Sequence, residues 1–378
     1  MSHSSKKNPV VLSIGIMAGN EEDSIQTTLE SLFRQTVFER LTVRHQQCEV
    51  VVVIPACTDR TIALTRSVFD RMEREHEWSD GFTLRLIDLP DAGKANAWNR
   101  FVHEFSAVEA RFICTMEPNI VFHHRDTIYN LMSTLERRPH VPASTGRQCS
   151  DLMFKERRTW SERLSLATSA MTGAEARRIC RQLFCVRTNV ARNLVIPRDL
   201  ETSEDGFIKE IICTDFLTRD GSTTRIAVAP EAAHIFEANV TAQQVLEAQT
   251  RQMLGQAAVH VAIEYLKTLP WNDRVNLAET IRRLESRDPD WLKRLIAEHL
   301  RAQRFSWQLV PGMVKTRFRR LWRLSPWQRV THFPAACAAV AVTFVASASA
   351  RRSLQKGMTP YLAKAATSAP ISVPQTAK

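Results

Sequence analysis

Residues 49–61 read EVVVVIPACTDRT, and this stretch decides the fold class. Its first six residues include four consecutive valines, an unbroken apolar run that suits a strand buried on both faces. A short polar loop follows, and residues 58–75 then carry apolar side chains at helical spacing. A fully buried strand that leads into a helix is typical of a parallel sheet covered by helices.

The same alternation runs through the first part of the chain. Strand patterns occupy residues 10–17, 82–89 and 111–116, and helical spacing occupies residues 22–36, 92–105 and 126–138. Strict alternation predicts βαβ units, and hence an α/β fold with a mostly parallel sheet flanked by helices. Ligands of such sheets bind beyond the carboxyl ends of the strands. The loops that follow the strands are therefore the candidate site.

After residue 150 the pattern is less regular. It predicts strands at 182–187 and 224–229 and helices at 152–178, 202–219 and 241–304. We therefore divide the sequence into a flexible N-terminus over 1–8, an α/β domain over 9–240 and a helical extension over 241–304.

The formal net charge of +11 is concentrated at the C-terminal end. Residues 299–378 contain thirteen Lys and Arg and no Asp or Glu, whereas the other 298 residues hold 38 basic and 40 acidic residues. A nearly neutral body with a cationic tail favours a polyanionic partner, either a membrane surface or a nucleic acid.

Two segments of this tail favour the membrane. Residues 305–332 interleave basic residues with tryptophan and phenylalanine, a composition typical of the bilayer interface. Residues 333–350 (FPAACAAVAVTFVASASA) are eighteen residues without charge, near the lower limit for a spanning helix. This segment has three interpretations: a spanning helix, an interfacial helix, or a helix packed on the body. We expect a membrane surface and no nucleic acid as partner, a cytoplasmic-face location, either peripheral or single-pass, and a flexible tail over 351–378.

Composition excludes several classes of protein. With 44% hydrophobic and 24% charged residues and one charge-free stretch of such length, the chain is no polytopic membrane protein. The first ten residues contain no apolar signal-peptide core, so we expect no secretion. None of the eight cysteines forms a C-x-x-C pair, and we expect them to be reduced.

Polar motifs follow the predicted elements in a fixed order. They are MAGNEE at 17–22, ACTDRT at 56–61, GKANAWN at 93–99, EPN at 117–119, SED at 203–205 and QTRQMLG at 249–255. Together they resemble the motifs of glycosyltransferase family 2, over roughly residues 10–256. The resemblance implies the GT-A fold and transfer of a sugar from a nucleotide diphosphate sugar.

The resemblance also implies a donor-binding site on the loops after the first strands. A base and ribose need polar groups on short loops, and a lysine meets a phosphate as a point charge. Asparagine and glutamate just after the first strand have a second interpretation, as caps of the following helix. Ile54 and Pro55 stand where many relatives carry aspartates, one of which commonly contacts the base, so recognition of the nucleotide, expected to be UDP, rests on other groups. The donor-binding residues are Asn20, Glu21, Asp59, Lys94 and Asn96.

Glu117 and Asn119 occupy the slot in which the family carries an aspartate pair. By resemblance they hold a divalent metal, Mg²⁺ or Mn²⁺, through oxygen donors. One carboxylate and one amide predict weaker or more selective binding than two carboxylates. His123, His124 and His234 are further candidate ligands, although we favour exposed histidines for all three.

Asp205 matches the family's general base, which deprotonates the acceptor hydroxyl, and Glu204 is the first acid of the same motif. Acidic residues in a first helical turn also interact well with the helix dipole. By resemblance Gln249 and Arg251 contact the acceptor or the diphosphate. Met253 or Gln252 replaces the family's tryptophan, which favours transfer of a single sugar over polymer synthesis.

The sequence thus indicates an inverting glycosyltransferase that acts on a lipid-linked or glycan acceptor. Two other classes stay open. One is a non-catalytic protein that keeps the GT-A fold, in line with the changed metal slot. The other is a polyanion-binding module that acts through the cationic tail.

Overall fold

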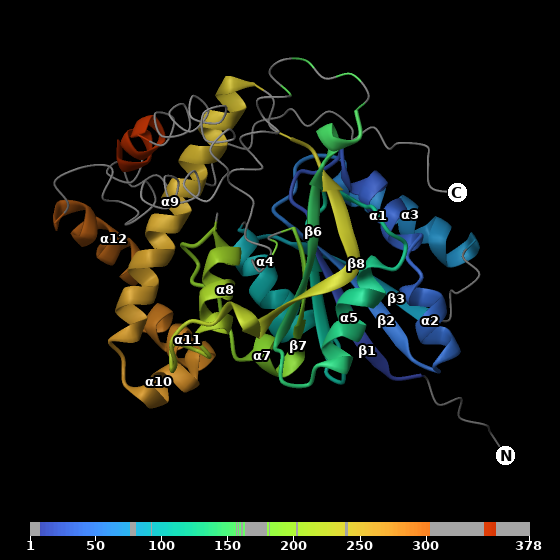
Figure 1. The fold of residues 1–378 in the computed structure, drawn as a ribbon, viewed down its shortest axis with the longest axis horizontal. Coiled ribbons are helices and arrows are strands. Elements are labelled where there is room, and N and C mark those ends of the chain that lie inside the picture. Colours follow the sequence, from blue (N-terminus) through green and yellow to red (C-terminus); the bar gives the residue numbers. More distant parts are fainter. Residues whose placement is uncertain are drawn as a thin grey trace, which may run out of the picture.

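The computed structural model describes residues 8–75, 81–91, 93–155, 157, 159, 162, 180, 182–201, 203–238, 241–302 and 344–352. Its described strands form one eight-stranded sheet in the order β3-β2-β1-β4-β7-β6-β8-β5 (Figure 1). The strands are β1 (Val10–Met17), β2 (Gln47–Pro55), β3 (Phe82–Leu89), β4 (Phe112–Met116), β5 (Ile120–Phe122), β6 (Ala143–Ser150), β7 (Leu183–Arg187) and β8 (Ile226–Phe236).

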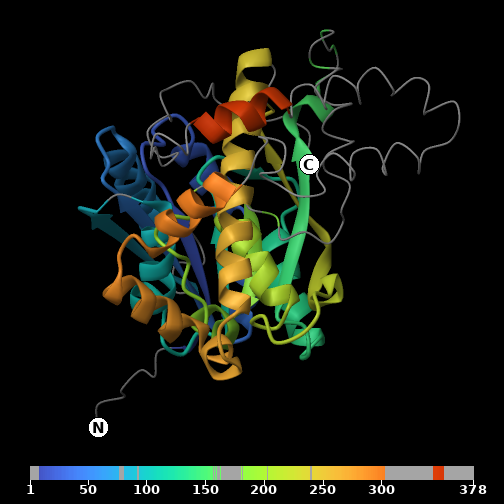
Figure 2. The ribbon, with the colours of Figure 1, turned by 90° about the vertical axis from the view of Figure 1, so that its left-hand side faces the viewer.

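Helices cover both faces of this sheet (Figures 1 and 2). One core lies beneath α1 (Ile25–Phe33), α2 (Val37–Val43), α3 (Thr61–Glu75) and α5 (Thr127–Arg137). A second core lies beneath α4 (Lys94–Arg100), α8 (Glu204–Cys213), α9 (Ala242–Lys267), α11 (Leu277–Arg287) and α12 (Trp291–Ala302). Two shorter α-helices, α7 (Thr188–Arg192) and α10 (Trp271–Val275), connect these elements.

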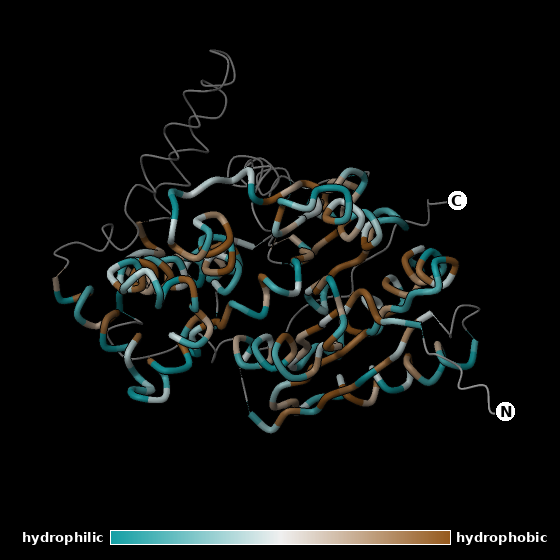
Figure 3. The backbone as a smooth tube through the Cα atoms, turned by 90° about the horizontal axis from the view of Figure 1, so that it is seen from below, coloured by the Kyte–Doolittle hydropathy of each residue, from teal (hydrophilic) through white to brown (hydrophobic). Residues whose placement is uncertain are grey.

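The valine run of β2 explains why two cores form. Successive side chains of a strand point to opposite faces, so Val50 and Val52 enter the first core and Val51 and Val53 enter the second. β2 lies between β1 and β3, and both pairings are parallel, as predicted. Figure 3 shows the hydropathy of the backbone trace, in which hydrophobic and hydrophilic residues alternate along the coiled helical segments.

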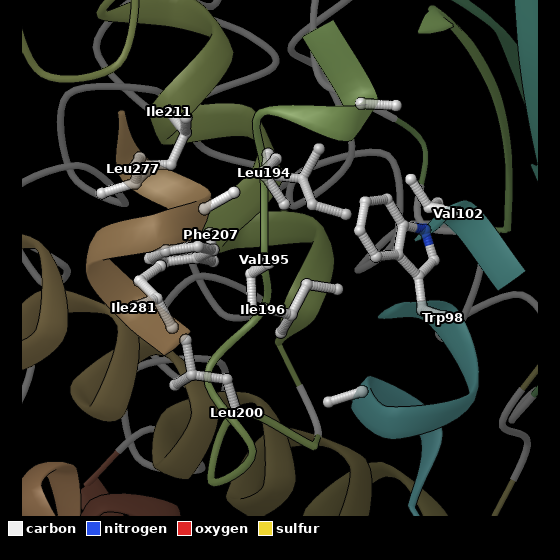
Figure 4. Packing of buried hydrophobic residues seen from close by; sticks show 14 of the residues in the cluster. Trp98, Val102, Leu194, Val195, Ile196, Leu200, Phe207, Ile211, Leu277 and Ile281 are labelled. Carbon is white, nitrogen blue, oxygen red and sulfur yellow. The ribbon is translucent and has the colours of Figure 1, made fainter. Parts of the chain in front are cut away.

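The second core fixes α4 and α8 relative to each other. Trp98 of α4 packs beside the segment Leu194–Leu200, and Phe207 of α8 packs against Ile281 of α11 (Figure 4). Trp98 and Phe207 are among the largest fully buried side chains. Burying side chains of this size contributes several kcal/mol in all, so the first turns of α4 and α8 are held rigidly.

Gly15 allows this layer to approach the sheet closely. A Cβ on Gly15 would lie 2.2 Å from Cε1 of Phe101, which begins a π-helical turn (Phe101–Phe105) directly after α4. Any larger residue at this position would push the Phe101 ring, and with it the end of α4, away from β1.

The structure corrects several sequence-based boundaries. The sheet is mixed, because β7 is antiparallel to β4 and β6, and β5 is antiparallel to β8. β5 and β6 were not predicted. β6 reads ASTGRQCS and has no apolar run, yet its polar residues are buried in part by the neighbouring β7 and β8. The helix predicted over 22–36 is shorter, since α1 covers Ile25–Phe33, and a separate helix that was not predicted, α2, follows at Val37–Val43.

The C-terminal segments lie largely outside the described residues. This holds for 305–332, for 333–343 and for the tail after 352, so the predicted interfacial segment is not described. Residues 344–352 form a helix that crosses α9 in Figure 2, and its Ala346 and Ala350 pack against Met253 and Leu300. Within the described residues, no helix has the length and hydropathy required to cross a bilayer. The seven cysteines in the described part of the chain are free thiols.

Candidate active site

The loops after β1 and β2 are joined by side chains that the sequence analysis selected. The Asn20 side-chain oxygen accepts the backbone N–H of Thr58 at 2.9 Å, and Asn20 itself has a left-handed backbone with φ of 54°. α1 begins at Ile25 after Ser24, so neither Asn20 nor Glu22 caps it, and that interpretation was wrong. The asparagine instead holds two strand-end loops side by side.

Asp59 is the centre of this loop pair. Its carboxylate accepts the Thr61 backbone N–H at 2.9 Å, the Cys57 thiol at 3.0 Å and the Glu22 backbone N–H at 3.1 Å. Burial raises the pKa of this carboxyl, but the hydrogen bonds outweigh burial and lower the pKa below its ordinary value. Asp59 is therefore ionised, and its hydrogen bonds shape the loop after β2.

Glu21 is buried beside this loop. Its backbone N–H donates to the Thr61 hydroxyl at 2.7 Å, and its carboxylate accepts the Ser24 hydroxyl at 3.0 Å. Thr61 thus touches both Asp59 and Glu21, and it was not singled out from the sequence.

Gly93 places Lys94 at the start of α4. Its φ of 116° is open to glycine but not to other residues without strain, and a Cβ there would lie 2.7 Å from Oε1 of Glu201. Glu201 Oε2 accepts the Lys94 backbone N–H at 2.6 Å. Burial raises the pKa of the Glu201 carboxyl above its ordinary value, and the backbone N–H groups of Lys94 and Ala95 act in the opposite direction.

The Lys94 ammonium bridges two buried carboxylates. Its Nζ lies 2.7 Å from Oε1 of Glu117 and 2.5 Å from Oε1 of Glu204. Glu117 is 6% exposed and Glu204 is 5% exposed, so these are charge-assisted contacts shielded from water. One lysine therefore joins the residue after β4 to the first turn of α8.

Asp205 follows Glu204 in that first turn. Burial is the main cause that raises the pKa of the Cys180 thiol to about 12, and the negative charges of Glu117 and Asp205 add to it. Asp205 directly follows Glu204, whose carboxylate contacts the Lys94 ammonium, so the predicted base lies one residue along the chain from that ion pair.

Asn99, the last residue of the GKANAWN motif, has a structural role. Its side chain donates to the Ile196 carbonyl at 2.8 Å and accepts the Ile196 N–H at 2.9 Å. This two-way contact anchors the segment that leads into Glu201 and α8. Asn96, predicted to bind the donor, lies half-buried in α4 two residues after Lys94.

Gln249 and Arg251 lie half-buried on α9, and the Gln249 side chain donates to the Gln252 side-chain oxygen of the same helix at 3.4 Å. A Cβ on Gly206 of α8 would contact Val259 of α9. The two helices therefore pack at a point of α9 that is eight residues C-terminal to Arg251. That separation is about 12 Å along the helix axis. Met253 is buried against Ala346 and Ala350, so it supports the C-terminal helix, whereas Gln252 is exposed.

His234 of β8 is fully buried, contrary to the expectation of an exposed side chain, whereas His123 and His124 are exposed as expected. Its Nε2 lies 3.1 Å from the Gln182 side-chain oxygen and 3.6 Å from the Cys180 sulfur, and its Nδ1 is buried without a hydrogen-bond partner. Burial lowers the pKa of His234 to about 4, so the imidazole is neutral. Four consecutive residues of β8 around His234 are buried, so no alternation along the strand indicates this burial, and no motif marks it.

Comparison with solved structures identifies the fold. The mannosyltransferase PcManGT from Pyrobaculum calidifontis, solved with GDP-Man and Mn²⁺, matches with a TM-score of 0.50 and 16% identity over 90% of this chain and 86% of that chain. The fold is GT-A. S. aureus TarS with UDP matches with a TM-score of 0.44 and 16% identity over 92% of each chain. Glucosyl-3-phosphoglycerate synthase from Mycobacterium tuberculosis, solved with Mn²⁺, UDP and phosphoglyceric acid, matches with a TM-score of 0.43 and 13% identity. The match covers 69% of this chain and 80% of that chain.

The GT-A assignment rests on the first of these structures. A scan against protein-family models and a search of curated proteins found no match.

The residues of the GT-A metal slot fit a divalent cation in part. Asn119 Oδ1 and Glu204 Oε2 are buried oxygens without a hydrogen-bond partner, and Glu117 adds a carboxylate, so hard oxygen donors are present. Within the described residues, no three His, Cys, Asp or Glu side chains are grouped so as to hold a metal. A divalent cation here would therefore need oxygens of a ligand to complete its coordination shell.

Proposed function

We propose that this protein is an inverting glycosyltransferase that moves one sugar from a nucleotide diphosphate sugar to a hydroxyl acceptor. The observation that carries the proposal is the Lys94 ammonium between Glu117 and Glu204, with Asp205 in the adjoining turn. Glycosyl transfer needs positive charge beside the leaving diphosphate and a base beside the acceptor hydroxyl. The ammonium and the partial metal shell would supply the charge, and the carboxylate would supply the base.

The donor would lie across the loops after β1, β2 and β4. The Asn20–Thr58 contact and the ionised Asp59 would provide a polar surface on which the nucleoside binds. Lys94 supplies a point charge for the diphosphate. A divalent cation bound through Glu117 and Asn119 would neutralise negative charge on the leaving diphosphate.

Asp205 acts as the general base. The acceptor oxygen forms a bond to the anomeric carbon as the bond from that carbon to the diphosphate oxygen breaks. The hydroxyl proton passes to the Asp205 carboxylate, and the bonding pair leaves with the nucleoside diphosphate. A single displacement of this kind inverts the anomeric centre.

We further propose that the acceptor is lipid-linked or a glycan precursor, and that the protein works at the cytoplasmic face of a membrane. The thirteen basic residues after His299 and the charge-free run at 333–350 support this. UDP is the proposed nucleotide, and Gln249 and Arg251 of α9 are the proposed acceptor-side contacts.

A nucleotide-release assay tests the reaction. The full-length protein is incubated with Mn²⁺, bacterial lipid extract and UDP-, GDP-, CMP- or dTDP-linked sugars in turn. Wild type should release nucleotide from one donor class, and Asp205→Asn should release far less, while the exposed Asp220→Asn serves as a matched control. Equal release by wild type and Asp205→Asn would contradict the proposal.

A further inference from the structure

The contact of Lys94 with Glu117 has a consequence for metal binding. Glu117 is the carboxylate of the proposed metal slot, and the oxygen that faces the site is 2.7 Å from the Lys94 ammonium. A divalent cation bound to that oxygen would stand within a few ångströms of a positive charge, and such like charges repel strongly in a buried site.

Three carboxylates hold Lys94, two through its ammonium and one through its backbone. Glu117 and Glu204 contact its Nζ, and Glu201 fixes its backbone N–H at the start of α4. The Lys94 side chain is 23% exposed, so water reaches it from one side. A diphosphate that arrives from that side can draw the ammonium toward its own oxygens.

We infer that Lys94 is an internal counter-ion that keeps divalent metal off Glu117 until a nucleoside diphosphate takes the ammonium. In the nucleotide-free protein the ammonium neutralises Glu117 and Glu204. When the diphosphate binds, Lys94 pairs with phosphate, the Glu117 oxygen is released to the metal, and phosphate oxygens complete the coordination shell. The inference rests on the proposed donor site, and it predicts that nucleotide and metal bind together.

Glu204 is a positioning residue in this arrangement. Its Oε1 contacts the ammonium and its Oε2 is buried without a hydrogen-bond partner. An ammonium that left without replacement would strand two buried carboxylates at 5% and 6% exposure, which is costly. Release of Lys94 therefore requires another cation to arrive, and the metal is that cation.

Removal of the lysine charge should have opposite effects on the two ligands. Lys94→Met should bind Mn²⁺ at least about tenfold more tightly than wild type in the absence of nucleotide. The same variant should bind UDP or GDP with Mn²⁺ about tenfold or more weakly, because the phosphate contact is lost. A merely structural role for Lys94 would weaken both or neither.

The experiment titrates MnCl₂ alone into the full-length protein and follows free Mn²⁺ by electron paramagnetic resonance. Lys94→Arg keeps the charge and should retain wild-type affinity. Lys267→Met removes a surface lysine paired with Glu264 at 3.0 Å and serves as the matched control. Lys94→Gln, which can still hydrogen-bond to both carboxylates, replaces Lys94→Met if that variant does not fold.

Mn²⁺ binding by folded Lys94→Met or Lys94→Gln that is no tighter than in wild type overturns the inference. Absence of Mn²⁺ binding in every variant overturns it as well. A protein that shows the lysine effect but binds no nucleoside diphosphate supports the counter-ion and refutes the donor site. A protein that binds the nucleoside diphosphate but shows no lysine effect supports the donor site and refutes the counter-ion.

Discussion

The Glu201 carboxylate accepts the backbone N–H of Lys94 at 2.6 Å, across 107 positions of sequence. This contact ties the loop before α8 to the first residue of α4. Because Lys94 also contacts Glu117 and Glu204, its backbone and its side chain are both fixed by acidic residues from other parts of the chain. The geometry of the proposed donor site depends on that attachment.

Glu201→Gln should alter the pH dependence of stability. Burial raises the pKa of Glu201, so between its unfolded and folded pKa values the native state holds more protons than the unfolded state. Wild type therefore loses stability from this group as pH rises through that window. Chemical denaturation at pH 4 and pH 7 should show Glu201→Gln gaining stability relative to wild type at the higher pH. A constant difference would show that burial of Glu201 has no such effect.

Asp205→Asn should preserve the fold and lower turnover by about 10²–10⁴-fold, because an amide cannot take the acceptor proton. Steady-state kinetics with the preferred donor measure the loss, and donor affinity should change little. Glu204→Gln is the informative neighbour, since it weakens the hold on Lys94 and leaves the base in place. Normal turnover in Asp205→Asn together with loss of activity in Glu204→Gln would show that Glu204, and not Asp205, is the base.

Asn119→Asp should tighten Mn²⁺ binding in the presence of nucleotide, because a second carboxylate replaces a neutral amide oxygen. Asn119 Oδ1 is already buried without a partner, so the substitution changes charge with little change in shape. Calorimetry with UDP or GDP present measures the gain, and Glu117→Ala should abolish binding. Metal affinity indifferent to both substitutions would place the metal elsewhere.

His234 should make the protein acid-sensitive. Its folded pKa of about 4 lies below the unfolded value of 6.5. Between pH 6.5 and pH 4 the imidazole is therefore protonated in the unfolded state and neutral in the native state. Stability contributed by the neutral imidazole is complete above pH 6.5 and falls by about 3 kcal/mol as pH falls to 4. Urea melts across this range should show the loss, and His234→Gln should remove this component while other groups continue to titrate. An unchanged pH profile in His234→Gln would contradict the burial argument.

The cationic C-terminal region should direct the protein to anionic bilayers. A chain that ends at Ala302 loses twelve of the thirteen basic residues that follow His299, together with the charge-free run. Co-sedimentation with phosphatidylserine vesicles should fall at least about tenfold, and binding by the full chain should weaken in high salt. Retention on DNA equal to that on vesicles would favour the nucleic-acid interpretation.

Much of the fold follows from periodicity in the sequence. The predicted strands at 10–17 and 82–89 coincide with β1 and β3; β1 is an apolar, β-branched run, and β3 alternates polar and apolar residues over FTLRL. β6 escaped prediction because its burial depends on β7 and β8, which lie far away in the sequence. The local pattern predicted β7 as a strand over 182–187, but its antiparallel direction and the short strand β5 are set by tertiary pairing.

The candidate site was predicted unevenly for a similar reason. Motif order pointed to Lys94, Glu117 and Glu204, and the structure brings these together, with Asp205 next to Glu204 in the first turn of α8. Glu201 carries no motif, and its role comes from a contact with a backbone N–H 107 residues earlier. Met253 or Gln252 was expected in place of the family's tryptophan; Met253 is buried against Ala346 and Ala350, a contact that no local pattern reveals.

Ligand-dependent thermal stability tests the central claim most directly. The full-length protein is melted with Mn²⁺ and each of UDP-, GDP-, CMP- and dTDP-linked sugars, beside Glu117→Ala under the same conditions. A donor at 100 times its dissociation constant stabilises the native state by about 2.7 kcal/mol, so one donor class should raise the melting temperature by several degrees in wild type and much less in Glu117→Ala. No shift with any nucleotide sugar at millimolar concentration, or an equal shift in the variant, would contradict a metal-assisted donor site at Glu117.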